Sequence, residues 1–204
     1  MPFNIAAFKA NGLVYGGSRP ALFNVFLSVP PELNIDQVSV DKFRFVCQGA
    51  ELPAASVAPI DVGYFGRKIK VAGDRTYSDW TVSVMNDEDF AVKSLFEAWS
   101  NGLNRFVSNV RDPQLAEEEY KIDLEIVKYS KDGSITRAYS MIGAWPMEVG
   151  PITQNWNDQN KVEEFNVTFC YDYWVPIIET SDKKAGGVNV YGPDTLADGN
   201  QGPS

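Results

Sequence analysis

Residues 71–89 read VAGDRTYSDWTVSVMNDED, and this stretch joins several local structural signals without a break. From Trp80 onward every second residue is apolar, through Val82 and Val84, while the residues between them are Thr and Ser. A strand with one face on a core and the other in water has this period of two. We therefore expect a half-buried strand here.

A helix is expected directly after this strand. Asn86 has the side chain of a helix N-cap, and the carboxylates of residues 87–89 would lie in the first turn, where the helix dipole favours them. Gly102 suits a C-cap. The apolar spacing predicts one amphipathic helix over about Asp87–Leu103 with these core residues: Val92, Leu95, Phe96, Trp99 and Leu103.

Alternating apolar residues also predict the other strands of the body. In order, these cover residues 21–29, 43–47, 120–126, 135–145 and 164–173. The second carries Phe43, Phe45 and Cys47 on its dry face, and the third and fourth would pair through an Asp-Gly turn. Pro146 and Pro151 would interrupt pairing. The predicted fold is mainly β, an antiparallel β-sandwich or small barrel with one packed α-helix, a long hairpin arm and extended termini.

Residues 57–71 are predicted to form the hairpin arm, which bends at Gly66. Tyr64 and Phe65 would lie near its tip, where leaving large apolar groups in water forgoes roughly 1.5–3 kcal/mol each. We expect the arm to contact a partner, although a tip folded back on its own domain would also hide the rings. The candidate subunit-interface residues are Tyr64, Phe65, Arg67, Lys68 and Lys70.

The charge of the chain argues against a protein that grips nucleic acid. Eighteen basic and twenty-seven acidic side chains give a net charge of −9. Duplex DNA, with one charge per roughly 1.7 Å of axis, would be repelled. On composition alone, the same acidity is also what keeps many ordinary proteins in solution.

Signatures of catalysis and metal binding are missing from the sequence. The chain has no histidine, which removes the usual general base, pH sensor and metal ligand. No phosphate-binding loop or nucleophile motif occurs. The acidic pairs Asp87/Asp89 and Glu163/Glu164 are better explained by a helix start and a strand edge. We expect no enzyme activity, no cofactor and no metal, with Cys47 and Cys170 reduced.

Three segments are expected along the chain: an N-terminal arm (1–19), a β domain (20–178) and a flexible, Gly-rich tail (179–204). No apolar run approaches the ~20 residues of a membrane helix, and no secretion signal is visible. The chain should therefore lack a membrane anchor and be assembled in the cytoplasm.

Two separated stretches resemble the tail tube proteins of contractile-tailed bacteriophages, the T-even-like myovirus tube family. One is AGDRTYSDWTV running into VMNDE, and the other is GAWPMEVGPITQNWNDQNKVEEFNVTFCYDYW at 143–174. FRFVCQGAELPAASV (43–57) and GRKIKVAGDRT (66–76) are also similar to the family. The family-motif residues are Asp74, Arg75, Trp80, Asn86, Asp87, Trp99, Trp145, Pro146, Trp156, Tyr173 and Trp174.

The resemblance implies a structural virion protein that forms the inner tail tube as stacked hexameric rings. Six copies with a net charge of −9 would carry −54 formal charges around a lumen that conducts DNA without specific binding. The implied partners are further copies of the chain, the tail sheath protein, baseplate and tail-terminator proteins, and a tape-measure protein inside the lumen.

Two other functions are compatible with the same sequence. A baseplate tube-initiator, or the tube of a related contractile injection system, would form rings by the same means. A monomeric β-sandwich that binds a ligand or acts as an enzyme would have gained these motifs by chance.

Overall fold

The structure is a computed structural model that describes residues 4–13, 16–33, 35–111, 113 and 119–177. Its strands are β1 (Phe23–Phe26), β2 (Cys47–Ala50), β3 (Ala55–Tyr64), β4 (Arg67–Tyr77), β5 (Trp80–Met85), β6 (Ile122–Tyr129), β7 (Ile135–Val149), β8 (Glu164–Cys170) and β9 (Tyr173–Ile177). Its helices are α1 (Ile5–Gly12), α2 (Gln37–Val46), α3 (Ala91–Leu103) and the short 3₁₀ helix η1 (Pro31–Leu33).

The body is built from two antiparallel sheets that share β7. One sheet has the order β1-β6-β7-β9, and the other has the order β7-β8-β5-β2. β7 changes sheets at Gly143, which has a positive φ of 67°. The N–H of Gly143 donates to the Asp123 carboxylate, and a Cβ here would collide with the Asp172 carboxylate. Glycine therefore makes the corner at which one strand serves both sheets.

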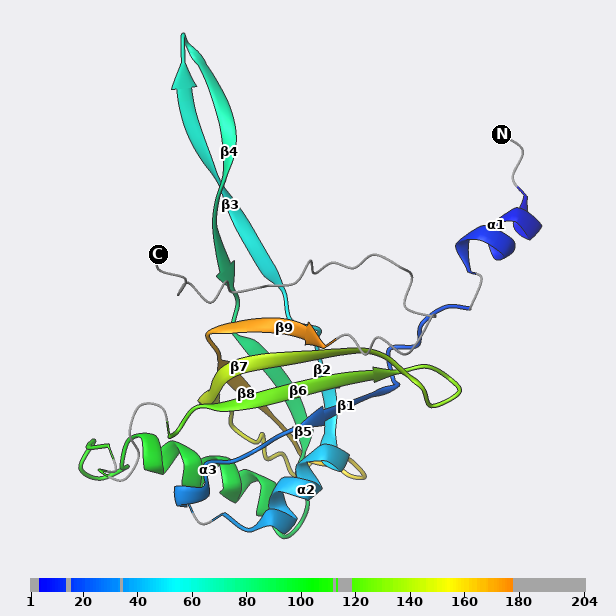
Figure 1. Ribbon diagram of the computed structural model, residues 1–204. Coiled ribbons are helices and arrows are strands. Elements are labelled where there is room, and N and C mark those ends of the chain that lie inside the picture. Colours follow the sequence, from blue (N-terminus) through cyan, green and yellow to red (C-terminus); the bar gives the residue numbers. More distant parts are fainter. Residues whose placement is uncertain (1–3, 14–15, 34, 112, 114–118, 178–204) are drawn as a thin grey trace, which may run out of the picture.

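The core lies between the sheets and the helices α2 and α3, which cover one side of the body in Figure 1. Phe96 of α3 packs edge-on against Phe43 and Phe169, with ring centroids 5.5 and 5.8 Å apart. The indole N–H of Trp99 donates to the Tyr120 carbonyl (3.3 Å), so its one polar group is satisfied. The long hairpin β3–β4 projects away from this core (Figure 1).

The alternating pattern at residues 80–84 and the hairpin at 120–145 were predicted correctly. Trp80, Val82 and Val84 are buried in β5, while Thr81 and Ser83 are less buried. β6 pairs with β7, and Gly133 takes a positive φ of 82° in the turn between them. The mainly β, antiparallel fold predicted from the sequence is confirmed.

The strand predicted at residues 43–47 is wrong, because residues 37–46 form the helix α2. The Asp36 side chain accepts a hydrogen bond from the Val38 N–H and caps its start. Phe43 is fully buried, whereas Phe45 is 76% exposed. A strand would have placed both rings on one face, and the buried set Val40, Phe43 and Cys47 instead follows helical spacing. The sequence predicted one packed α-helix, whereas the body has two, α2 and α3.

The helix predicted to begin at Asp87 begins later, at Ala91. Phe90 holds a left-handed conformation (φ 53°), and the Asp89 carboxylate accepts a bond from the Ala91 N–H. Asn86 does not cap the helix. It is buried, and its side-chain amide donates to Glu163 (3.0 Å).

Two strand boundaries also differ from expectation. Pro146 does not interrupt pairing, since β7 continues through it opposite Phe169, with a register shift between Pro146 and Glu148. The single strand predicted over 164–173 is divided into β8 and β9, and these strands belong to different sheets. Within the predicted N-terminal arm the structure contains α1, and the predicted tail 179–204 lies outside the described residues.

Candidate subunit interface

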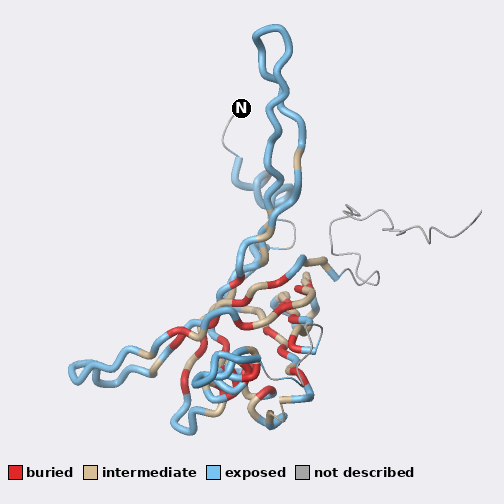
Figure 2. The backbone as a smooth tube through the Cα atoms, turned by 90° about the vertical axis from the view of Figure 1, so that its left-hand side faces the viewer, coloured by how far each residue is buried: buried red, intermediate tan, exposed pale blue. Residues whose placement is uncertain are grey.

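The β3–β4 hairpin is a ribbon with two unlike faces. Register places Ile60 opposite Val71 and Val62 opposite Ile69 on one face, and all four side chains are about half exposed. The other face carries charged side chains: Asp61, Lys68 and Lys70. Figure 2 shows the ribbon exposed along almost its whole length. A lone two-stranded hairpin is marginally stable in water, which makes this apolar face a candidate for a subunit contact.

The hairpin tip exposes an aromatic side chain in a strained turn. Phe65 and Gly66 both have positive φ, 45° and 78°, as a two-residue type I′ turn requires. For a non-glycine residue this conformation costs roughly 1–2 kcal/mol. Phe65 is 90% exposed, and its ring meets that of Tyr64 edge-on with centroids 4.6 Å apart. Strain held together with exposure points to a contact made outside the chain.

The root of the hairpin is fixed to the body by aromatic residues. The indole N–H of Trp174 donates to the Ala54 carbonyl (3.2 Å), and that of Trp80 donates to the Glu51 carbonyl (2.6 Å). The Tyr77 ring lies against Trp174, with centroids 6.5 Å apart. The hairpin therefore spans residues 55–77, beyond the 57–71 expected from sequence, and leaves the body from a firm base.

Three strands of the body have a strand neighbour on one side only. Among the described residues, β1 and β9 end one sheet and β2 ends the other. Such edges present free N–H and C=O groups that pair readily with another chain.

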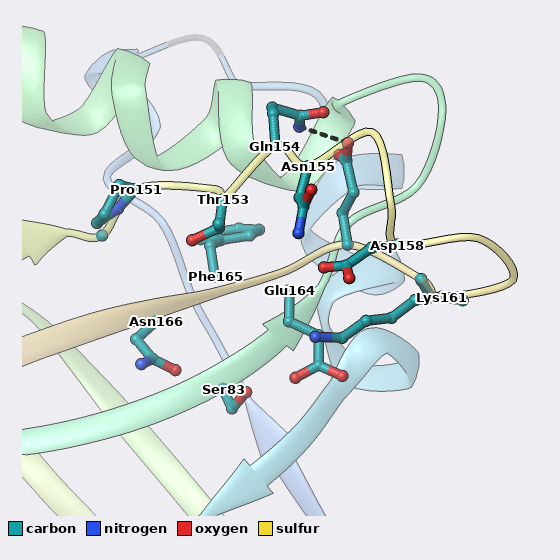
Figure 3. A pocket seen from close by; sticks show the side chains of 13 residues that line it. Ser83, Pro151, Thr153, Gln154, Asn155, Asp158, Lys161, Glu164, Phe165 and Asn166 are labelled. Atoms are coloured by element: carbon teal, nitrogen blue, oxygen red, sulfur yellow. Dashed lines mark hydrogen bonds between the residues drawn. The ribbon is translucent and has the colours of Figure 1, made fainter.

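A polar pocket of about 520 Å³ lies between the loop 151–163 and the strands β5 and β8 (Figure 3). Its charged lining residues are Asp158, Lys161, Glu163 and Glu164. The Glu163 carboxylate accepts hydrogen bonds from Gln154 (2.5 Å) and Asn86 (3.0 Å), and these bonds hold its pKa below the ordinary value. Trp156, on the same loop, is 99% exposed.

A second pocket of about 480 Å³ lies near the root of the hairpin. It is lined by residues 49–54, residues 78–81, Ser83, Asn166 and Tyr171, and it shares Ser83 and Asn166 with the first pocket. Glu51 and Asp79 are its charged lining residues.

The acidic pair Asp87/Asp89 joins two helices. Lys42 of α2 lies 2.5 Å from both carboxylates, just before α3. Hydrogen bonding to Lys42 lowers the pKa of each carboxyl, and the same bonds raise the pKa of Lys42. The described residues contain no group of three or more His, Cys, Asp or Glu that could hold a metal, and no helix among them is long and apolar enough to cross a membrane.

The two cysteines are free, as expected, and lie at different ends of β5. Cys47 is opposite Val84, whereas Cys170 follows Phe169, which is opposite Trp80. Burial raises the pKa of the Cys47 thiol to about 12, so it behaves as an apolar core group.

The remaining motif residues are spread through the fold and do not form one site. Trp80 and Trp99 are in the core, and Pro146 is buried beside Trp145, whose ring packs edge-on against Tyr120 (6.2 Å). Asp74 and Arg75 are exposed on β4, and Tyr173 is exposed on β9.

Sequence reasoning missed the exposed apolar face of α2. Val38 is 68% and Phe45 is 76% exposed there, and the Arg44 guanidinium lies 4.7 Å from the Phe26 ring. Only helical numbering would have separated Phe45 from Phe43. It also missed the polar pocket, because its walls are brought together by pairing between β5 and β8.

The family model described as "Phage tail tube protein" matches residues 18–176. The chain belongs to this family. Tail tube protein gp19 of Enterobacteria phage T4 is 35% identical over 158 residues, which cover 77% of this chain and 90% of that protein. Tail tube protein gp19 of Enterobacteria phage T6 has the same identity and coverage. This phage tail tube protein is therefore a structural, non-enzymatic component of a contractile tail.

Solved structures of contractile machines share the fold of this tail tube protein. A chain from the sheath/tube terminator of an extracellular contractile injection system matches with a TM-score of 0.58 at 16% identity, over 81% of this chain and 99% of that chain. A chain of the sheath-tube complex of the same system matches with a TM-score of 0.51 at 14% identity, over 86% of this chain and 98% of that chain. A chain of the tube-terminating cap of the anti-feeding prophage matches with a TM-score of 0.57 at 15% identity, over 80% of this chain and 92% of that chain.

Proposed function

We propose that six copies of this tail tube protein form a ring and that rings stack into the inner tube of a contractile tail. The tail sheath surrounds the tube, and baseplate and tail-terminator proteins meet its ends. Tape-measure protein and DNA pass through the lumen without specific binding.

The observation that carries the proposal is the β3–β4 hairpin. Its apolar face and its aromatic tip are exposed in the single chain, although the hairpin is firmly rooted in the body. Burying Tyr64 and Phe65 against another copy would recover roughly 1.5–3 kcal/mol for each ring. The single-neighbour strands β1, β2 and β9 support lateral joining of copies, since a closed ring removes free sheet edges.

The charge supports an unobstructed lumen. A net charge of −9 on each copy disfavours adhesion of DNA to the wall of the tube. Screening confines this repulsion to roughly 8–10 Å from the wall at working salt.

A tube-initiator or tube-terminator role is the second candidate. It is favoured by the likeness of the fold to a tube-terminating cap and a sheath/tube terminator. A terminator or initiator would form rings that stop after one layer, so negative-stain images of the purified chain separate the two roles by tube length.

Deletion of residues 64–67 tests the role of the hairpin. We expect a folded monomer that forms no tubes, with sedimentation measuring assembly and circular dichroism measuring the fold. Tubes of normal length from the deleted chain would rule this role out.

A finer variant removes the aromatic tip without weakening the turn. Phe65→Asn places Asn before Gly66, and Asn-Gly is the pair that a type I′ turn prefers. The free energy of unfolding should therefore stay equal or rise, while tube formation falls. The matched control is Phe106→Asn, since Phe106 is also highly exposed (71%) but lies in the loop after α3. Equal effects of the two substitutions on assembly would contradict a specific role for the tip.

A further inference from the structure

We propose that the hairpin tip of one copy binds the polar pocket between loop 151–163 and strands β5 and β8 of a second copy. This contact rests on the proposed tube and specifies how one copy fastens to the next. The pocket is then the receptor for the basic, aromatic turn at residues 64–68.

The hairpin is net basic, whereas the other residues of the chain together are net acidic. The hairpin, residues 55–77, carries four basic and two acidic side chains and has a net charge of +2. Because the whole chain has a net charge of −9, the other residues together carry −11. At the tip, Arg67 and Lys68 flank the turn, and Lys68 is only weakly engaged by Asp61, at 3.6 Å. The pocket is lined by three acidic side chains and one basic side chain.

The acidic character of the pocket is built into the fold. Gln154 and Asn86 both donate to the Glu163 carboxylate and fix it in its charged form at the edge of the cavity. Asp158 comes from the loop and Glu164 from the first position of β8, so two separate elements contribute negative charge (Figure 3). A basic group that enters here meets carboxylates from the loop and from β8, beside the ammonium group of Lys161.

Apolar groups match as well. Trp156 is 99% exposed between the lining residues Asn155 and Asp158, and Val162 on the same loop is 57% exposed. The tip offers Tyr64 and Phe65, also exposed. Aromatic rings in a polar setting are the groups that most often anchor protein interfaces.

The hairpin cannot reach the pocket of its own chain. β4 runs into β5 at the root of the hairpin, and Glu164 pairs with Met85 at the far end of β5. With ten residues in β3 and six in β5, the tip and the pocket are separated by roughly 50 Å at about 3.3 Å per residue. Figure 1 shows the tip and the loop after β7 on opposite sides of the body. Copies joined tip to pocket therefore run head to tail, so each copy can still bind a further copy at either end.

Charge reversal tests this pairing in the full-length chain. Arg67→Glu with Lys68→Glu at the tip, or Asp158→Lys with Glu164→Lys in the pocket, should each raise the protein concentration needed for tube formation by about tenfold or more. The chain that carries all four substitutions should return to near the parental concentration. Glu51→Lys in the second pocket is the matched control and should leave assembly unchanged.

Failure of this pairing is distinguishable from failure of the proposed function. If the pocket reversal assembles at the parental concentration, or the fourfold variant stays as impaired as either double variant, the pocket is not the receptor. If Glu51→Lys alone impairs assembly, the second pocket takes its place and the proposal is overturned. In each of these cases loss of tubes on deleting 64–67 would still support the tube function.

A disulfide trap reads the contact directly. Phe65→Cys combined with Asn155→Cys should give a ladder of covalent multimers on a non-reducing gel after mild oxidation of assembled protein. Either single substitution and the parent chain, whose own cysteines are Cys47 and Cys170, should stay monomeric on that gel. Absence of the ladder from fully assembled tubes would overturn the proposal.

Discussion

Gly143 illustrates how much of this fold depends on one residue without a side chain. It has a positive φ, and its Cα faces the Asp172 carboxylate, which in turn lies 3.1 Å from the Lys121 ammonium. Glycine adopts the positive φ without strain, and any other residue here would also have to displace the Asp172 side chain. The sheet corner therefore fixes where β9 lies.

Replacing this glycine should cost more than replacing one in an open turn. Gly143→Ala should lower the free energy of unfolding by about 2–4 kcal/mol, from backbone strain plus displacement of Asp172. Gly133→Ala is the control, since Gly133 also has a positive φ but no atom within 4 Å of the place that a Cβ would occupy, and it should cost only about 1–2 kcal/mol. Urea unfolding measures both, and equal losses would contradict the close approach.

Individual residues were predictable where their environment is local. The alternation at Trp80, Val82 and Val84 indicated burial correctly because a strand needs only a period of two. Asn86 was misread as a cap because its partner, Glu163, is 77 positions away. Nothing in the residues around Asn86 records that contact.

At the scale of elements, α2 marks the limit of short patterns. Phe43, Phe45 and Cys47 alternate as a strand would, and five residues are too few to separate a period of 2 from one of 3.6. Asp36 is a good N-cap, and the longer frame from residue 37 to 46 would have favoured a helix.

Two substitutions test this helix. Phe43→Ala should cost about 3–5 kcal/mol, because it empties a fully buried site beside Phe96. Phe45→Ala should change the free energy of unfolding by no more than about 0.5 kcal/mol in the monomer. Chemical denaturation measures both changes in the free energy of unfolding. If residues 43–47 formed a strand, the two substitutions would cost similar amounts.

The Lys42 link between α2 and the start of α3 should make stability depend on pH. The folded-state pKa values of Asp87 and Asp89 are lowered, so their contribution is present above the unfolded value of about 3.9 and is lost as pH falls through the folded values. The raised pKa of Lys42 means that its contribution is complete below about 10.4 and is lost at higher pH.

Lys42→Met should therefore lower the thermal midpoint at pH 7, and its difference from the parent should shrink below about pH 4. High salt should also reduce the difference, because the groups are partly exposed. The control is Lys131→Met in the β6–β7 turn, which should leave the midpoint unchanged. A difference that is constant across pH would contradict an electrostatic link.

At the scale of the whole molecule, sequence patterns located most strands but not their partners. The hairpin β6–β7 was predicted because its turn is local, whereas the sharing of β7 between two sheets and the polar pocket depend on pairing between distant segments. For the same reason, sequence patterns indicate only one side of the candidate interface. The tip residues are contiguous, but the surface that would receive them is not.

The net charge gives a prediction about the assembled tube. Tubes and single chains should not retard duplex DNA in a gel at about 0.15 M salt, because each copy carries a net charge of −9. Retardation at micromolar protein would contradict a lumen that leaves DNA free. Repeating the test at lower salt distinguishes weak, screened adhesion from true repulsion.

The continuity of β4 with β5 has a mechanical consequence. Only Ser78 and Asp79 separate the exposed ribbon from the central strand, which is hydrogen-bonded to β2 on one side and β8 on the other. A pull on the ribbon is thus delivered lengthwise to a strand held along both margins, where many bonds must shear together. Under tension a filament of such units should yield at its joints and leave each unit intact.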